Sequence, residues 1–235
     1  MSDRLEVFPD EAALARAAAA ILADQLSDGI DARGAALFAG SGGRTPVGIY
    51  QRLSSTPLAW EQVTVTLTDE RWVDETSPDS NAGLLDRCLF KDSAAEAAFL
   101  PLKTGAATPE DDARRASLAL STAGDRLDAV LLGMGEDGHI ASLFPGSPVL
   151  PAGLDPAQPQ PCLAVPAGVD GLAPPQPRLT LSLPALLGAH CIVLAITGAE
   201  KRRVFEQAEA GDDIYAMPVR AVLRSPAPLR VLWAP

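Results

Sequence analysis

Short apolar runs that end in a glycine turn and lead into a helix recur along the chain, and this recurrence constrains the fold more than any other feature. Residues 35–39 form a continuous apolar run followed by glycines, and residues 63–67 alternate with β-branched side chains. Residues 128–132 and 191–197 are again largely apolar and again run into glycine. Runs of this kind predict strands that are buried on both faces. The sequence therefore predicts an α/β chain built on an open sheet.

Helices are predicted between these strands, at 12–26, from Thr45 onward, at 112–123 and at 198–209. Thr45 is expected to be an N-cap with Pro46 at the first helical position, and Asp28-Gly29 is expected to end the first helix. Ligands bind open α/β sheets beyond the carboxyl ends of the strands. We therefore expect the four turns that follow the strands to lie together around one site.

Proline is concentrated in one segment, since ten of the 21 prolines fall between Pro145 and Pro177. Proline lacks an N–H and fixes φ, which disfavours long helices and central strands. Residues 145–177 are therefore predicted to be extended and partly edge-like rather than a second domain. The 235 residues are predicted to form a single α/β domain, 1–235.

The composition excludes several classes of partner and location. The chain carries 19 Lys and Arg against 30 Asp and Glu, a formal charge of −11 at pH 7, which argues against binding nucleic acid or an anionic membrane. No apolar run approaches the roughly 20 residues that span a bilayer, and the N-terminal residues do not resemble a secretory signal. The three cysteines form no CxxC pair. We expect a soluble cytoplasmic protein, a monomer or a homodimer.

The first turn, AGSGGRTP at 39–46, has the features of an anion site. Glycines allow backbone N–H groups to converge on an anion, and a helix N-terminus favours negative charge. Gly42, Gly43, Arg44 and Thr45 are therefore candidate phosphate ligands. The alternative is a tight strand-to-helix connection whose glycines only relieve strain.

The third turn contains a GxGxxG pattern at Gly133, Gly135 and Gly138. A dinucleotide site also needs an acidic residue about 20 residues further on, after a second strand. The proline-rich segment stands there instead, with Asp155 as its acidic residue. A nicotinamide or flavin cofactor is therefore not expected.

The same turn places His139 two residues after Asp137, with Gly138 between them. A histidine titrates near neutral pH, and a nearby carboxylate orients its ring, so this pair is a candidate general base. The alternative is an imidazole that only hydrogen-bonds the loop. His190, the second histidine, merely precedes an apolar strand and is assigned no role.

Further charged residues follow the other strands. Asp69 and Arg71 come directly after a predicted strand, in what we expect to be a structured loop, and Lys201 begins the last helix. Arg178 precedes the strand-like residues 179–181. Each of these, taken alone, is also compatible with an ordinary solvated surface. The sequence has no GxSxG, no HExxH and no clustered metal ligands, so neither a serine nucleophile nor a metal is predicted.

Taken together, the motifs resemble those of the 6-phosphogluconolactonase family over most of the chain. Residues 133–146, GMGEDGHIASLFPG, are close to the family signature GMGxDGHTASLFPG. Residues 39–46 resemble its SGGSTP loop with Arg44 in place of serine, 68–73 resemble its DER segment, and 198–201 resemble its glycine-to-lysine turn. The resemblance implies a Rossmann-like open, mostly parallel sheet with helices on both faces.

The resemblance also implies a function. The expected reaction is hydrolysis of 6-phospho-D-glucono-1,5-lactone to 6-phosphogluconate, in the oxidative pentose phosphate pathway and without a cofactor. His139 would take a proton from the attacking water and Asp137 would orient it. The substrate-binding residues would be Gly42, Gly43, Arg44, Thr45, Asp69, Arg71, Gly138, Arg178 and Lys201.

Two alternatives are considered. Glucosamine-6-phosphate deaminases are similar in the first loop and in DGH, but their motif continues into asparagine-glutamate-proline, whose carboxylate helps the histidine open the sugar ring. Residues 142–145 here read SLFP and carry no carboxylate, which favours the lactonase. A non-catalytic sugar-phosphate-binding module is the second alternative, and the intact DGH argues against it.

Overall fold

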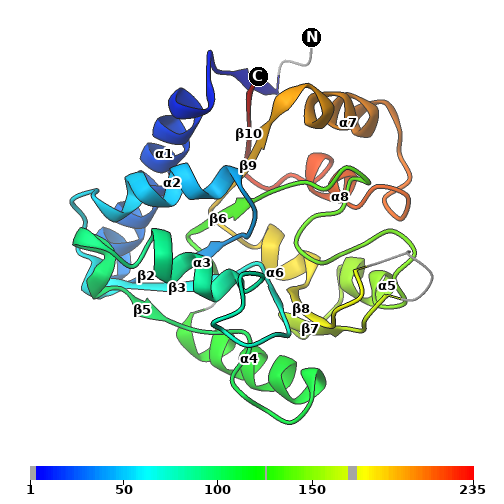
Figure 1. Ribbon diagram of the computed structural model, residues 1–235, viewed down its shortest axis with the longest axis horizontal. Helices are drawn as coiled ribbons and strands as arrows, with labels where there is room; N and C mark the ends of the chain where they lie inside the picture. The colour runs from blue at the N-terminus through cyan, green and yellow to red at the C-terminus, as the bar shows by residue number, and fades with distance from the viewer. Residues whose placement is uncertain (1–3, 125, 169–173) are drawn as a thin grey trace.

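The chain folds around a parallel sheet, as the sequence predicts. The structure, a computed structural model, describes residues 4–124, 126–168 and 174–235, so part of the proline-rich segment and the first three residues of the N-terminus lie outside it. Within these residues a seven-stranded sheet has the order β1-β10-β9-β6-β2-β3-β5, with every neighbouring pair parallel (Figure 1). A smaller antiparallel sheet has the order β4-β8-β7.

The element bounds follow the predicted order. The strands are β1 (Leu5–Val7), β2 (Ala36–Gly40), β3 (Val63–Leu67), β4 (Asp69–Arg71), β5 (Ala98–Phe99), β6 (Ala129–Leu132), β7 (Cys162–Val165), β8 (Arg178–Leu181), β9 (Cys191–Thr197) and β10 (Leu229–Ala234). The helices are α1 (Glu11–Arg33), α2 (Thr45–Ser54), α3 (Asn81–Cys88), α4 (Pro109–Ala123), α5 (Leu150–Leu154), α6 (Leu183–Leu187), α7 (Gly198–Ala210) and α8 (Val219–Leu223), with short 3-10 turns at Trp60–Gln62 and Asp92–Glu96.

The strand order reverses between β2 and β6. From β2 the sheet continues through β3 to β5 on one side, and from β6 through β9 to β10 on the other. In Figure 1, α1 and α2 lie on one side of the sheet and α6, α7 and α8 on the other. The fold class is therefore confirmed. A reversal of this kind opens a crevice at the carboxyl ends of the strands, where open α/β sheets bind ligands.

The first helix is longer than the sequence predicts. Gly29 was expected to end it, yet α1 continues to Arg33 and ends at Gly34, which has a left-handed φ of 75°. Gly29 is needed there for close approach, because a Cβ at this position would lie 2.7 Å from the Oδ1 atom of Asp128. Asp128 in turn accepts hydrogen bonds from Arg33 and from the backbone N of Leu37. The prediction of a turn at residues 28–29 is wrong because this buried carboxylate fills the space a side chain would need.

The N-cap prediction for the second helix is also wrong. Arg44, in a helical conformation and without a side-chain capping bond, precedes α2, while Thr45 is its first residue and Pro46 falls in its first turn. The Thr45 hydroxyl lies 3.2 Å from the hydroxyl of Thr197, at the end of β9. Thr45 therefore joins two turns of the carboxyl edge instead of capping the helix.

The smaller sheet is the feature of the fold that the sequence analysis misses. Asp69 and Arg71, expected in a loop, belong to β4, whose antiparallel register places Asp69 opposite Thr180 and Arg71 opposite Arg178. The proline-rich segment supplies the edge strand β7 and the five-residue helix α5. The described part of the segment thus combines one edge strand with one short helix.

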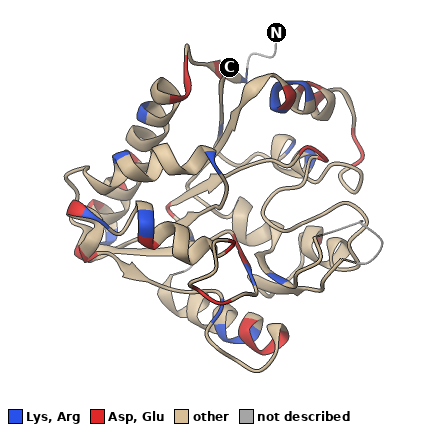
Figure 2. Cartoon of the chain, in the orientation of Figure 1, with Lys and Arg blue, Asp and Glu red and all other residues tan. Residues whose placement is uncertain are grey.

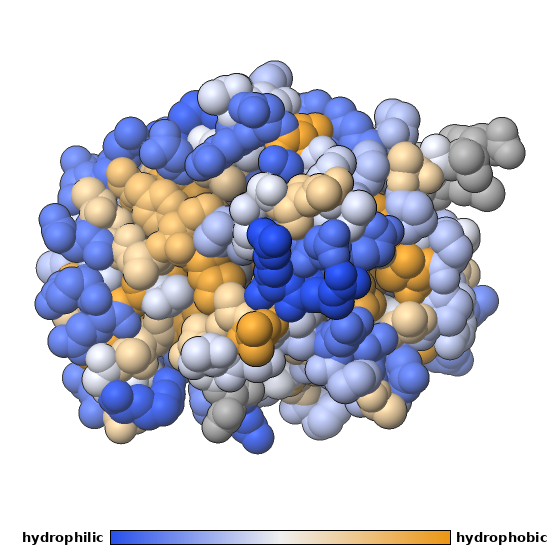
Figure 3. Space-filling view, turned by 90° about the horizontal axis from the view of Figure 1, so that it is seen from below, coloured by the Kyte–Doolittle hydropathy of each residue, from blue (hydrophilic) through white to orange (hydrophobic). Residues whose placement is uncertain are grey.

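Lys and Arg residues are interspersed with Asp and Glu residues along the chain, as Figure 2 shows. Both acidic and basic residues occur on α4 and on α7. Seen from below, apolar groups gather on the left half of the molecule and a compact hydrophilic group lies near the centre (Figure 3). None of the helices among the described residues is both long and apolar enough to cross a membrane.

Candidate active site

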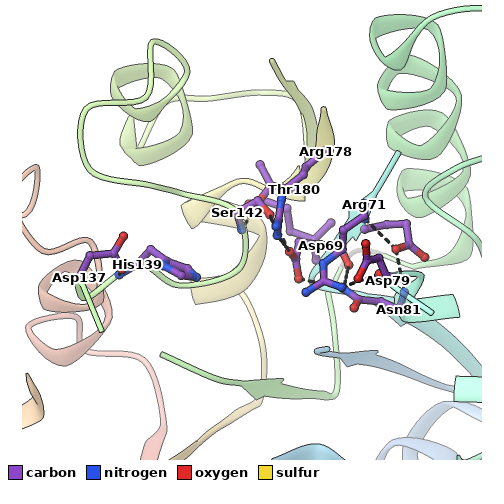
Figure 4. Close-up of polar contacts among 11 residues, drawn as sticks. Asp69, Arg71, Asp79, Asn81, Asp137, His139, Ser142, Arg178 and Thr180 are labelled. Atoms are coloured by element: carbon purple, nitrogen blue, oxygen red, sulfur yellow. Dashed lines mark hydrogen bonds and ion pairs between the residues drawn. The ribbon is translucent and has the colours of Figure 1, made fainter. Parts of the chain in front are cut away.

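The four turns predicted to share a site meet at the carboxyl edge of the main sheet. They surround a cleft of about 240 Å³, beside the point where the strand order reverses between β2 and β6. Residues from both sheets line it: Ser41, Gly42, Gly43, Asp69, Arg71, Asn81, Gly133, Met134, Gly135, His139, Ala141, Arg178 and Lys201. Figure 4 shows His139 with Asp137 on one side of this region and the Asp69–Arg71 strand on the other.

The turn after β6, Gly135–His139, holds the candidate base and is called the base turn below. The Nδ1 atom of His139 lies 2.6 Å from Oδ1 of Asp137, which also accepts a 3.0 Å hydrogen bond from the His139 backbone N–H. The backbone N–H of Gly135 donates to the His139 carbonyl at 2.9 Å and closes the turn. A Cβ at Gly135 would lie 2.0 Å from Nδ1. Only glycine at this position leaves room for the imidazole–carboxylate pair.

The electrostatics of the pair suit a base. Burial raises the pKa of Asp137, but hydrogen bonds from the His139 ring and backbone outweigh it and hold that pKa below its usual value. Asp137 is therefore an anion at neutral pH. It favours the tautomer in which Nδ1 carries the proton, because an anionic oxygen accepts that hydrogen bond. The Nε2 lone pair is then free to take a proton from a ligand or water.

Opposite the base turn lie five polar residues that are together called the arginine wall: Asp69, Arg71, Asn81, Ser142 and Arg178. The Arg71 guanidinium donates to the Asp79 carbonyl, and the other four residues contact one another. The Ser142 hydroxyl donates to Asp69 at 2.6 Å, and the Asn81 amide donates to the Asp69 carbonyl at 2.8 Å. The Arg178 guanidinium lies 3.7 Å from the Asp69 carboxylate. The residues come from β4, α3, β8 and the turn after β6, so this wall joins the two sheets.

Ala141 explains how Ser142 reaches that wall. Its φ of 47° is left-handed, which is unusual for a residue with a side chain and costs about 1 kcal/mol. The unusual turn places the Ser142 backbone N–H 3.1 Å from the Thr180 hydroxyl and its side chain against Asp69. Strained backbone of this kind is concentrated at functional sites.

Glu70 anchors the arginine wall from behind. It is 3 % exposed, and each of its carboxylate oxygens accepts two hydrogen bonds. The donors are the backbone N–H groups of Arg71, Asn81 and Ala82 and the hydroxyl of Ser80. Burial raises the pKa of Glu70, and these hydrogen bonds oppose that rise. The carboxylate thus ties β4 to the N-terminus of α3 and fixes the backbones of Arg71 and Asn81 relative to each other.

Both arginines of the wall retain unused donors. Among the described residues, the buried Nε atoms of Arg71 and Arg178 have no hydrogen-bond partner. Burial lowers the pKa of Arg178, although Asp69 counteracts the effect, and a guanidinium stays cationic at neutral pH. Buried donors are nearly always paired in folded proteins. Both arginines also line the cleft, and their cationic guanidinium groups suit an anion that binds there.

A second hollow of about 560 Å³ adjoins the cleft and shares Gly42, Gly43 and Lys201 with it. Arg44 and Thr45 line this second hollow and do not line the cleft. Gly42 is constrained on the cleft side, because a Cβ there would lie 2.0 Å from the Asn81 side chain. The glycine loop thus separates two spaces, each with its own cations.

The structure brings most of the predicted residues together. Gly42, Gly43, Asp69, Arg71, His139, Arg178 and Lys201 line one cleft, and Asp137 supports His139 from behind. Gly138 faces away from the cleft: its φ is 79°, a Cβ there would lie 2.9 Å from Met217, and its carbonyl accepts from Val219 at 2.9 Å. Its place in the structure is that of a turn-forming residue.

Sequence reasoning missed Glu70 and Ser142 as parts of the site. Both stand inside motifs it had singled out, but their contacts cross between elements that only the smaller sheet brings together. Among residues 4–124, 126–168 and 174–235, no group of three or more His, Cys, Asp or Glu side chains is placed to hold a metal ion.

Comparison with known proteins agrees with these findings. A family model described as glucosamine-6-phosphate isomerases/6-phosphogluconolactonase matches residues 9–233. The 6-phosphogluconolactonase of Rhizobium meliloti (strain 1021) is 44% identical over 236 residues, covering 100% of both chains. A crystal structure of a 6-phosphogluconolactonase from Shewanella baltica OS155 has a TM-score of 0.93 at 37% identity, covering 100% of this chain and 98% of that one. A monomeric glucosamine-6-phosphate deaminase shares the fold, with a TM-score of 0.80 at 22% identity over 98% of this chain and 97% of that chain. The chain belongs to the glucosamine-6-phosphate isomerase/6-phosphogluconolactonase family.

Proposed function

We propose that this chain is a 6-phosphogluconolactonase, which hydrolyses 6-phospho-D-glucono-1,5-lactone to 6-phosphogluconate. One observation carries the proposal: the hydrogen-bonded His139 and Asp137 lie across one cleft from Arg71 and Arg178. Each of these arginines has an Nε atom without a hydrogen-bond partner among the described residues. The full-length similarity to 6-phosphogluconolactonases supports it. The base turn can transfer a proton and the arginine wall can bind an anion. Hydrolysis of a phosphorylated lactone requires both.

The proposed mechanism begins at His139. Its Nε2 takes a proton from a water molecule as the water oxygen attacks the lactone carbonyl, and the resulting imidazolium returns that proton to the ring oxygen as the C–O bond breaks. Asp137 holds the Nδ1 proton and stabilises the imidazolium. A lactone is an activated ester, so this sequence needs no covalent intermediate.

The cations of the cleft are proposed to hold the phosphate. Arg71 and Arg178 supply guanidinium donors from one side, and Lys201 supplies an ammonium group from the start of α7. The backbone N–H groups of Gly42 and Gly43 add donors at the end of β2, next to the N-terminus of α2. Arg44, in the adjoining hollow, is proposed to assist at longer range through its charge. Thr45, which is neutral, is proposed to assist indirectly, by linking the turn before α2 to Thr197 at the end of β9.

The remaining assignments are proposals of the same kind. We propose that residues 1–235 act as one α/β domain in the cytoplasm, as a monomer or a homodimer. The net charge of −11 supports a protein that works without nucleic-acid or membrane partners. It also slows the approach of an anionic substrate, so capture depends on the short-range cations of the cleft.

A paired assay tests the function. Lactone hydrolysis by the purified protein is measured against the spontaneous rate, and ammonia release from glucosamine 6-phosphate is measured in parallel. We expect hydrolysis far above the spontaneous rate and no ammonia. Ammonia release without lactone hydrolysis would assign the chain to the deaminases instead. Absence of both activities, with the sugar phosphate still bound, would indicate a non-catalytic binding module.

A further inference from the structure

The side chain of Phe144 contacts one residue on each side of the cleft. Its ring centroid is 4.4 Å from that of the His139 imidazole, with the two planes inclined at 50°. On the other wall, the Cζ atom of Arg178 lies over the same ring, 5.2 Å from its centroid. One aromatic ring therefore contacts both the proposed base and one of the proposed phosphate cations.

Phe144 is itself held firmly. It is 3 % exposed, and its carbonyl accepts a 3.1 Å hydrogen bond from the backbone N–H of Ser147. The preceding residues form a tight turn in which the Leu143 N–H donates to the Ile140 carbonyl at 2.9 Å. A phenyl ring with two side-chain dihedrals, packed in this way, is a rigid support for its neighbours.

Among the described residues, the side chains of His139 and Arg178 make one side-chain hydrogen bond each. The His139 ring is restrained by one side-chain hydrogen bond, to Asp137, which is itself 49% exposed. Arg178 lies 3.7 Å from Asp69 and 3.5 Å from the Ser142 hydroxyl, both of them long contacts, and its buried Nε has no partner among the described residues. A cation over an aromatic face is attracted to it, and an arginine in such a stack loses freedom of rotation. The phenyl ring is the contact that the His139 imidazole and the Arg178 guanidinium share.

We propose that Phe144 is a positioning residue that sets the His139 imidazole and the Arg178 guanidinium at a fixed separation. The inference rests on the proposed function, because it concerns the same cleft. A lactone whose phosphate is held by Arg178 presents its carbonyl at a set distance from that phosphate. The Phe144 ring holds the His139 imidazole at the distance from Arg178 at which the lactone carbonyl lies. The rate of proton transfer depends steeply on this alignment.

The test replaces the ring and keeps the bulk. In Phe144→Leu, we expect kcat to fall about tenfold, because His139 is less well aligned, and KM for the phosphorylated lactone to rise about fivefold, because Arg178 is freed. Phe144→Met, which fills the space with a flexible chain, is expected to behave in the same way and serves if the leucine variant is poorly folded. Phe90→Leu is the matched control, since Phe90 packs edge-on against Phe99 away from the cleft; its kcat and KM should stay unchanged.

A double-mutant cycle separates positioning from general packing. Binding of 6-phosphogluconate is measured by calorimetry in the wild type, Phe144→Leu, Arg178→Ala and the double variant. We expect Phe144→Leu to weaken binding about fivefold on its own and to add nothing once Arg178 is removed. Fully additive effects, or a leucine variant whose kcat and KM stay within twofold of wild type, would overturn the proposal. Binding is read without turnover, so a chain that lacked lactonase activity would refute the proposed function and still leave this coupling to be measured.

Discussion

The base turn and the arginine wall face each other across one cleft, yet they are built in opposite ways. The His139 and Asp137 side chains are 29% and 49% exposed, and their hydrogen bonds stay within the turn. The Arg178 and Asp69 side chains are 12% and 9% exposed, and their contacts cross between β4, β8 and the turn after β6. The difference matches two tasks. A base must exchange its proton with water, whereas a binding group gains from being buried and fixed in advance.

This contrast predicts that substitutions in the two regions act on different kinetic constants. Loss of the base turn should lower kcat and leave product binding in place. Loss of a cation from the arginine wall should mainly raise KM. The reason is that the phosphate is expected to be bound equally strongly in the ground state and in the transition state, and loss of such binding leaves kcat unchanged.

The largest effect is expected for His139→Ala. Removal of a general base typically costs 10²–10⁴ in rate, and we expect kcat to fall about 1000-fold. The affinity for 6-phosphogluconate, measured by calorimetry, should change little. The matched control is His190→Ala, since His190 is exposed and lies just before β9. A His139→Ala protein that hydrolyses the lactone at the wild-type rate would remove His139 as the base.

Arg71→Ala is expected to have the next largest effect. A charge-assisted hydrogen bond to phosphate contributes about 2 kcal/mol, which corresponds to a rise in KM of about 30-fold. The control is Arg114→Ala, because Arg114 is 65% exposed on α4 and pairs with Asp111. An unchanged KM for the phosphorylated lactone would exclude Arg71 from the phosphate site.

The two regions differ also in how far the sequence predicts them. The base turn is almost fully predictable, because Asp137 and His139 are two residues apart and the glycines around them mark a turn after a buried strand. The arginine wall is predicted only as separate candidates. Asp69 and Ser142 are 73 positions apart, and their contact depends on an antiparallel pairing of β4 with β8 that no local pattern indicates. Glu70 was unpredictable for the same reason, since its hydrogen-bond donors are set by the approach of α3.

Asp137→Asn tests the interior of the base turn. An amide at this position no longer carries the anion that stabilises the imidazolium, and we expect kcat to fall about tenfold with little change in KM. The lowered pKa of Asp137 means that the wild-type carboxylate stays ionised as the pH falls to 5, so any loss of wild-type activity over that range should not come from protonation of Asp137. A pH–rate profile of kcat/KM checks this. Asp155→Asn, in an exposed turn, is the control, and a kcat for Asp137→Asn equal to that of the control would contradict the assignment.

The smallest effect is expected for Arg44→Ser. Arg44 is exposed and lines the adjoining hollow rather than the cleft. Its electrostatic attraction for the phosphate is therefore weakened by the solvent and salt between them. We expect KM to rise about twofold at low salt and the difference to vanish at high salt. Arg52→Ser, further along α2, is the comparison. A tenfold rise in KM that persists at high salt would place Arg44 in direct contact with the substrate.

The base turn is proposed to act in the chemical step and the arginine wall in phosphate binding. A lactone without a phosphate tests this assignment most directly. Hydrolysis of glucono-1,5-lactone and of its 6-phosphate is measured as kcat/KM for the wild type, His139→Ala and Arg71→Ala. We expect His139→Ala to lower kcat/KM strongly for both substrates, whereas Arg71→Ala should lower it only for the phosphorylated one. An Arg71→Ala protein impaired equally toward both lactones would show that the arginine wall takes part in the chemical step, which would contradict the account.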